Sequence, residues 1–223
     1  MKLRRSVVIG FLFLLAACSG KPVLSYSLSL RTPNAAKAMV LIQATERVLT
    51  RRLAALEVKN ARVSAIPTGS GTGLLSLRLP DAKAAEAARR ILAETFTFSV
   101  RIEQGQKSKG DPGNLDQSNW RPTALTGSSI EWIQAIGLSS SGEIGVELQF
   151  NAKGRQILET IFRDNQGKDA GIFVRDLLVS KIKIQGKTVS DRVIIGGIPS
   201  AKVAEIFADD VNVGLHVFYT PAN

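Results

Sequence analysis

Two patterns of apolar and polar residues succeed each other along the first half of the chain. Residues 24–31 (LSYSLSLR) alternate apolar and polar side chains, which is typical of a strand with one buried face. Apolar residues then recur at helical spacing from Ala38 to Leu56, with Asn34 as a candidate helix cap. Two strands, a helix and a strand follow at residues 61–67, 73–79, 80–92 and 95–102. The order β-α-β-β-α-β predicts a ferredoxin-like unit with both helices on one face of a four-stranded sheet.

A glycine-rich segment, residues 68–73 (TGSGTG), separates the second and third of these strands. A phosphate-binding loop has a strand before its glycines and a helix after them. Because a strand follows here, we interpret the segment as a hairpin turn.

The second half has a similar mixture of elements. Residues 104–121 are polar, contain several glycines and show no period, so they indicate a linker or long loop. Beyond them we expect strands at residues 130–136, 145–150, 172–174, 177–185, 192–195 and 211–218, and helices that begin at Asn151 and at Pro199 and Ser200. The chain is therefore predicted to be an α+β protein with two lobes. The expected boundaries are a signal segment at 1–17, a tether at 18–23, a first lobe at 24–104, a linker at 105–121, a second lobe at 122–210, and a return strand and tail at 211–223.

The N-terminus predicts the compartment. Residues 1–5 are cationic, and residues 7–17 (VVIGFLFLLAA) are uncharged and too short to span a bilayer, as in a secretory signal. The run ends in Leu-Ala-Ala-Cys18, which resembles the lipobox of bacterial lipoproteins, where the cysteine sulfur receives a diacylglyceryl group. An ordinary signal peptide with an accidental cysteine is the alternative. Ser19 after the cysteine resembles the pattern that is sorted to an outer membrane, in a cell that has one.

Composition excludes several function classes. The 223 residues include a single cysteine and a single histidine, too few for a zinc site with several such ligands, and we expect neither metal nor cofactor. A Ser-His-Asp triad would need His216, which lies in an alternating segment with nothing nearby to support that role. The formal net charge of +10 favours binding to anionic lipid, cell-wall polymer or unfolded chains outside the cytoplasm. The alternative is that the charge only increases solubility. No stretch interleaves aromatic and basic residues as nucleic-acid binding requires.

Four blocks of sequence, in order, resemble the large extracytoplasmic domain of SecD, the accessory subunit of the bacterial protein translocase. They lie at residues 45–80, 125–154, 179–191 and 201–215. The resemblance implies a ferredoxin-like base, at about 24–104 plus 211–219, and a head at about 122–210 inserted before the last base strand. It also implies hinges in the linker, at Gly105, Gly110 and Gly113, and at the return, at Asp209 and Asp210.

The chain also departs from that family. SecD has six membrane-spanning helices and couples ion flow to export, whereas no segment after residue 18 of this chain reaches eighteen consecutive apolar residues. The acid of the family's hairpin is replaced by Gln185. We therefore expect a protein that acts passively or through partners.

The leading hypothesis is a non-enzymatic, lipid-anchored binding module in the cell envelope. It would hold extended or exported polypeptide, or a translocase component, in the groove between base and head. The alternative is a structural envelope lipoprotein that scaffolds a complex or binds a cell-wall or lipid component. Trp120 and Trp132 are expected to fill core or edge pockets, and either could instead anchor a partner.

Overall fold

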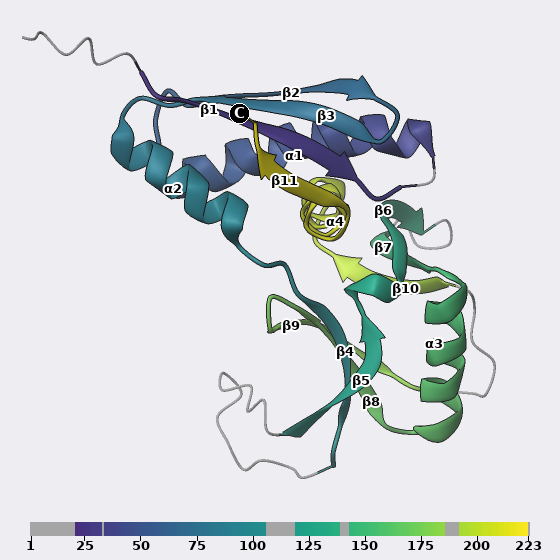
Figure 1. Cartoon of the computed structure of the whole chain (residues 1–223). Coiled ribbons are helices and arrows are strands. Elements are labelled where there is room, and N and C mark those ends of the chain that lie inside the picture. The colour runs from purple at the N-terminus through teal and green to yellow at the C-terminus, as the bar shows by residue number, and fades with distance from the viewer. Residues whose placement is uncertain (1–20, 33, 106–118, 139–142, 186–191, 223) are drawn as a thin grey trace, which may run out of the picture.

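The computed structural model describes residues 21–32, 34–105, 119–138, 143–185 and 192–222. They form two lobes that meet at one long helix, with a sheet and two helices above and a second group of strands below (Figure 1). The elements are β1 (Val23–Leu30), α1 (Ala35–Ala55), β2 (Arg62–Gly69), β3 (Thr72–Arg78), α2 (Ala82–Ala93), β4 (Phe98–Glu103), β5 (Trp120–Thr126), the 3-10 turn η2 (Gly127–Ser129), β6 (Ile130–Leu138), β7 (Glu143–Phe150), α3 (Ala152–Asp164), β8 (Asp169–Val174), β9 (Leu177–Lys183), β10 (Arg192–Ile198), α4 (Ala201–His216) and β11 (Val217–Pro221).

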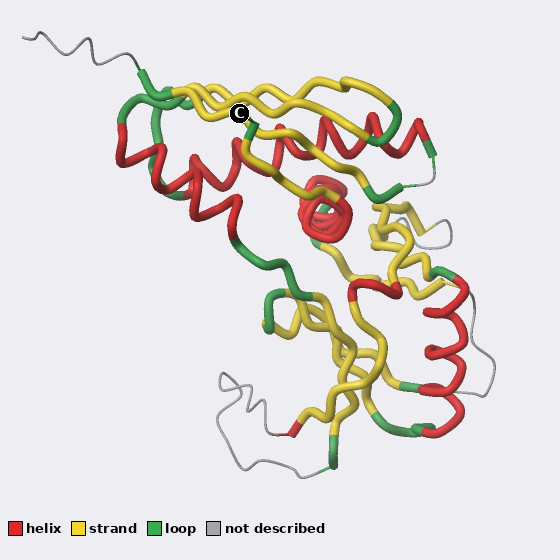
Figure 2. Tube along the Cα trace, viewed as in Figure 1, coloured by secondary structure: helices red, strands yellow, loops and turns green. Residues whose placement is uncertain are grey.

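The upper lobe, the base, has the ferredoxin-like arrangement that the sequence predicts. Its sheet has the order β11-β1-β3-β2, with every neighbouring pair antiparallel. Alternation along β1 turns Leu28 and Leu30 inward, where they pack against the apolar stripe of α1. Helices α1 and α2 lie on one side of this sheet, and no described helix covers the other side (Figure 2). The base therefore has one core and one open sheet face.

The fourth strand of the base is not the one that the alternation pattern indicated, but the return strand that the resemblance to SecD implied. The strand expected at residues 95–102 is β4, which pairs with β5 and β8 in the lower lobe, whereas β11 completes the base sheet. Phe98, Val100 and Ile102 of β4 are buried in the core of the lower lobe. Alternation shows which face of a strand is buried but carries no information about its neighbours, so the expectation was wrong about the partner.

The lower lobe, the head, has two sheets and one helix around a second core. The sheets have the orders β10-β7-β6 and β5-β4-β8-β9, and α3 packs beside them. Asn151 caps α3 as predicted, because its side chain accepts a hydrogen bond from the backbone amide of Gly154. Strand β5 begins at Trp120, inside the segment that the sequence assigned to the linker.

Helix α4 joins the two lobes and is longer than predicted. Residues 211–218 were expected to form a strand, but α4 continues to His216 and only the last two of these residues belong to β11. The helix places Ala204, Ala208 and Val211 in the head core and Val213 in the base core. Burial against two cores at helical spacing outweighs the strand preference of this valine-rich segment.

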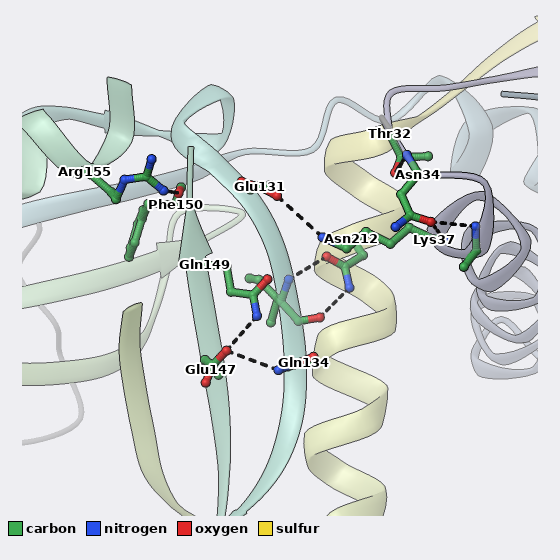
Figure 3. Close-up of polar contacts among 12 residues, drawn as sticks. Thr32, Asn34, Lys37, Glu131, Gln134, Glu147, Gln149, Phe150, Arg155 and Asn212 are labelled. Carbon is green, nitrogen blue, oxygen red and sulfur yellow. Dashed lines mark hydrogen bonds and ion pairs between the residues drawn. The ribbon is translucent and has the colours of Figure 1, made fainter. Parts of the chain in front are cut away.

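A buried amide adds two hydrogen bonds to the packing of α4 against the head. Asn212 is buried, its side-chain oxygen accepts from the amide of Ile133 at 3.0 Å, and its nitrogen donates to the carbonyl of the same residue at 2.7 Å. Figure 3 shows this amide between α4 and β6, facing the strand. Because β6 is an edge strand, the amide satisfies two backbone groups that a neighbouring strand would otherwise bind.

Replacing Asn212 by leucine keeps the volume of the side chain and removes both hydrogen bonds. The two polar groups of Ile133 then remain buried without partners, and the free energy of unfolding should fall by about 2–4 kcal/mol. Urea denaturation measures this change. Gln43→Leu, at an exposed site of α1, is the control and should change stability by less than about 0.5 kcal/mol. Equal stabilities for the two variants would contradict the role assigned to the amide.

Candidate functional site

A cleft of about 930 Å³ lies at the junction of base and head. The base contributes Arg31, His216 and Phe218 to its walls. The head contributes residues of β4, of the β5–η2 turn and of the β8–β9 turn, among them Phe98, Ser99, Arg101, Thr126, Ser128 and Asp176. The cleft is therefore lined by residues of both lobes.

Each wall carries an arginine held over an aromatic ring. The guanidinium of Arg31 lies 4.4 Å from the ring centre of Phe218, whose side chain is 39% exposed. On the opposite wall, Arg101 lies 4.3 Å from the ring centre of Phe173 and donates hydrogen bonds to Ser99 and Asp176. The lining also includes the carboxylates of Glu131 and of Asp176, which is paired with Arg101, so these walls offer apolar surface together with charges of both signs.

The base wall of the cleft includes an edge strand. Strand β11 pairs with β1, and no other described strand pairs with its second edge. Phe218 lies in this strand. An open strand edge beside an apolar side chain is a surface to which an extended chain can add by backbone hydrogen bonds.

His216 ends α4 at the rim of the cleft. It is buried, and its ring stacks on that of Trp132 with centroids 6.2 Å apart. Its Nε2 atom has no hydrogen-bond partner among the described residues. Burial, followed by the positive charge of Lys37, lowers the pKa of His216 to about 4, although a hydrogen bond with the backbone of Arg31 opposes this effect. The imidazole is therefore neutral at neutral pH.

The two tryptophans are both buried. Trp120 packs edge-on against Phe173 with ring centroids 5.3 Å apart. Trp132 comes from β6 of the head but packs in the core of the base, with Lys37 of α1 over its ring. Trp132 is thus part of the contact between lobes. A role of either residue as an anchor for a partner would require a movement that exposes it.

The residues expected at the return hinge lie inside a helix. Asp209 and Asp210 belong to the middle of α4, and Asp209 accepts two hydrogen bonds from Arg47 of α1, at 2.8 and 2.9 Å. Arg51 lies 3.6 Å from each of the two aspartates. Burial raises the pKa of the Asp210 carboxyl, although Arg51 opposes this effect. The two expected hinge residues therefore lie within a helix and are ion-paired with α1 of the base.

Of the remaining residues that the sequence predicted to be functional, only Gly105 lies in the described part of the chain. Gly105 follows β4 with φ of +67°, a conformation that favours glycine, and a β-carbon added to it would meet no described atom within 4 Å. Gly110, Gly113 and Cys18 lie outside the described residues. Within the described part of the chain, no helix is long and apolar enough to cross a membrane, and no three metal-binding side chains come together.

The close approach of the lobes depends on two glycines that the sequence analysis did not identify. A β-carbon at Gly214 of α4 would lie 2.3 Å from the ring of Phe96, and one at Gly127 would lie 2.4 Å from the side chain of Leu215. Both glycines line the cleft. Glycine in the last turns of an apolar helix was the one signal in the sequence that could have indicated this contact.

A polar network inside the head was also missed. Glu147 of β7 is buried and accepts hydrogen bonds from Gln134 and Gln149 at 3.2 and 2.7 Å, as Figure 3 shows. Arg192 of β10 completes the set at 3.3 Å from its carboxylate. The carboxylate is satisfied by three strands of one sheet, which makes it a structural group.

Comparisons with known proteins agree on one family. The family model described as the SecDF P1 head subdomain matches residues 103–214, about half of the chain. The fold is similar to a crystal structure of SecDF in its super-membrane-facing form, with 19% identity and a TM-score of 0.51 over 91% of this chain. A crystal structure of SecDF from Thermus thermophilus, called a translocon-associated membrane protein, is similar at 18% identity with a TM-score of 0.51 over 91% of this chain. The chain covers 30% of each of these proteins. No curated protein sequence matches it at a significant level.

The neutral state of His216 makes the stability of the protein depend on pH. Between about pH 6.5 and pH 4 the unfolded chain binds a proton at this histidine and the folded chain does not. The free energy of unfolding should therefore decrease as pH falls through this window, by up to about 3 kcal/mol from this group. Urea denaturation of the wild type and of His216→Phe measures the contribution, because the other titrating groups are common to both. Parallel pH profiles would show that His216 is not the group responsible.

Proposed function

The chain belongs to the SecDF P1 head family, and from this membership and the cleft between its lobes we propose that it is a non-enzymatic accessory protein of protein translocation. In this proposal the cleft binds a segment of extended polypeptide. Translocase components are the partners that the family suggests.

The proposal rests on the cleft, because its walls offer both hydrogen-bonding groups for a peptide backbone and apolar surface for side chains. Phe218 and the edge of β11 lie on one wall, and Ser99, Thr126 and Ser128 supply hydrogen-bonding side chains on the other. An extended segment could pair its backbone with β11 while Phe218 contacts one of its side chains. Arg31 favours a carboxylate in that segment, whereas Arg101 is already paired with Asp176.

A binding role is also favoured over catalysis by the state of the titratable groups. His216 is neutral, buried and stacked, and Asp209 is occupied by Arg47. Glu147 is occupied by its own sheet. None of these groups is paired with a nucleophile in the way that acid–base or covalent catalysis requires.

We further propose that Cys18 carries lipid and holds the two lobes at the outer face of a membrane. The uncharged segment at residues 7–17 and the cysteine that follows it support this anchoring. Several acyl chains give stable attachment, because each buried methylene contributes about 0.8 kcal/mol. Ser19 favours an outer membrane in a cell that has one. Gly105, Gly110 and Gly113 follow β4 and precede β5, which pair with each other in the head, so this segment does not connect the two lobes.

Removing Phe218 from the cleft should weaken polypeptide binding. Phe218→Ser deletes an apolar contact of about 1.5–3 kcal/mol, so the dissociation constant for an unfolded model protein should rise about tenfold or more. Fluorescence anisotropy with labelled, reduced and carboxymethylated α-lactalbumin measures the constant.

Val203→Ser is the matched control. Val203 lies on α4, is 44% exposed and does not line the cleft, so its replacement should leave binding unchanged. If the wild type does not bind the unfolded protein at all, the polypeptide hypothesis fails. Co-purification of one discrete envelope partner or glycan would then support the scaffold alternative.

Lipidation of Cys18 has a direct test. Expressed as the full chain in a bacterium, the protein should lose residues 1–17 and gain the mass of a diacylglyceryl group and an acyl chain at Cys18. Intact-mass spectrometry of the membrane fraction measures this change, and Cys18→Ser should abolish it. An unmodified cysteine in a cytosolic protein would refute the anchoring.

A further inference from the structure

A second hollow, of about 660 Å³, lies at the end of the base where the chain leaves the expected tether. Its lining includes three cationic residues, Lys21, Arg62 and Arg78, and no carboxylate among the described residues. It lies away from the cleft, with which it shares no residue. Its surroundings are the start of β1, the start of β2 and the end of β3.

The register of the base sheet places the cations side by side. Arg62 of β2 is directly opposite Arg78 of β3, and Arg78 is directly opposite Val23 of β1. The amide of Leu79 donates to the carbonyl of Pro22 at 3.0 Å, which holds the chain after the tether against the end of β3. Lys21 is thereby kept beside the arginine pair.

These three cations have no ion-pair partner among the described residues, and all are exposed. Opposite cross-strand positions bring Cβ atoms to about 4.5–5.5 Å, and like charges at such positions destabilise a sheet. An anion bound between the two guanidinium groups would remove this repulsion and could accept hydrogen bonds from both. The arrangement is therefore suited to a phosphate-like group.

The short length of the tether indicates which anion can reach this site. Lys21 is three residues after Cys18, so an extended tether keeps it within about 10 Å of the anchored cysteine. That distance is close to the screening length of about 8 Å at physiological ionic strength. Anionic headgroups of the membrane that holds Cys18 are thus within reach of all three charges.

We propose that Lys21, Arg62 and Arg78 form a docking site for the phosphate of an anionic phospholipid. Binding of this phosphate turns the end of the base that contains the hollow toward the membrane. This inference rests on the proposed lipidation of Cys18. With this end at the bilayer, one end of the base sheet faces the headgroups. The base is then held by two attachments, one covalent and one electrostatic.

The test uses the full lipidated chain in nanodiscs of phosphatidylcholine alone or of phosphatidylcholine with phosphatidylglycerol. Hydrogen exchange should slow at residues 60–65 and 76–80 only in the discs with phosphatidylglycerol. Salt at about 1 M, where the screening length is about 3 Å, should abolish this protection. Inorganic phosphate added to discs of phosphatidylcholine should give none, and protection by phosphate alone would overturn the assignment to lipid.

The double variant Arg62→Gln, Arg78→Gln should shift the ratio of docked to undocked base about 30-fold toward the undocked state, at about 1 kcal/mol per charge. Its protection should then equal that in phosphatidylcholine. The control is Arg89→Gln, Arg90→Gln, which removes the same charge from exposed sites of α2 and should keep the protection. Equal loss in both variants would overturn the site in favour of net charge.

Intact mass of the same samples separates this inference from the anchoring. A lipidated chain without protection specific to phosphatidylglycerol overturns the docking site and leaves the anchor in place. A chain that carries no lipid overturns both proposals.

Discussion

Burial of α4 between two hydrophobic cores is the constraint on which the rest of the structure depends. The helix supplies Ala204, Ala208 and Val211 to the head and Val213 to the base. Its amide at Asn212 closes the edge of β6. Because the same rigid element completes both lobes, neither core is whole without it, and the position of the head follows from the packing of one helix.

The packing of α4 against both lobes also determines how far the two walls of the cleft can move relative to each other. Movement of the head relative to the base would have to separate Trp132 from His216, or break the pair between Arg47 and Asp209, or bend α4 near Gly214. Each of these contacts is a packed or charge-assisted interaction, which favours discrete arrangements over continuous flexing. The two walls, with their aromatic rings and arginines, are therefore held at a defined spacing, as a preorganised binding site requires.

The sequence predicted the types of element far better than their partners. Alternation correctly indicated β1 and β3, the caps predicted at Asn34 and Asn151 are the ones observed, and the last helix begins after Ser200, close to the predicted start. The valine-rich end of α4 was interpreted as a strand because alternate residues in it are apolar. The structure buries those residues on two sides of a helix, where each side meets a different core. A local pattern cannot distinguish one buried face from two.

By itself the sequence determined the fold class, the two-lobed organisation and the resemblance to SecD, because these follow from the periods of apolar residues and from motifs close in the chain. Only the tertiary structure decided that β4 leaves the base and pairs with β5 and β8 in the head. It alone brought Arg31 and Arg101 to opposite walls of one cleft, and Arg62 beside Arg78 at the tether. Such neighbours are set by strand register and core packing across long separations in sequence, and side-chain periodicity carries no record of them.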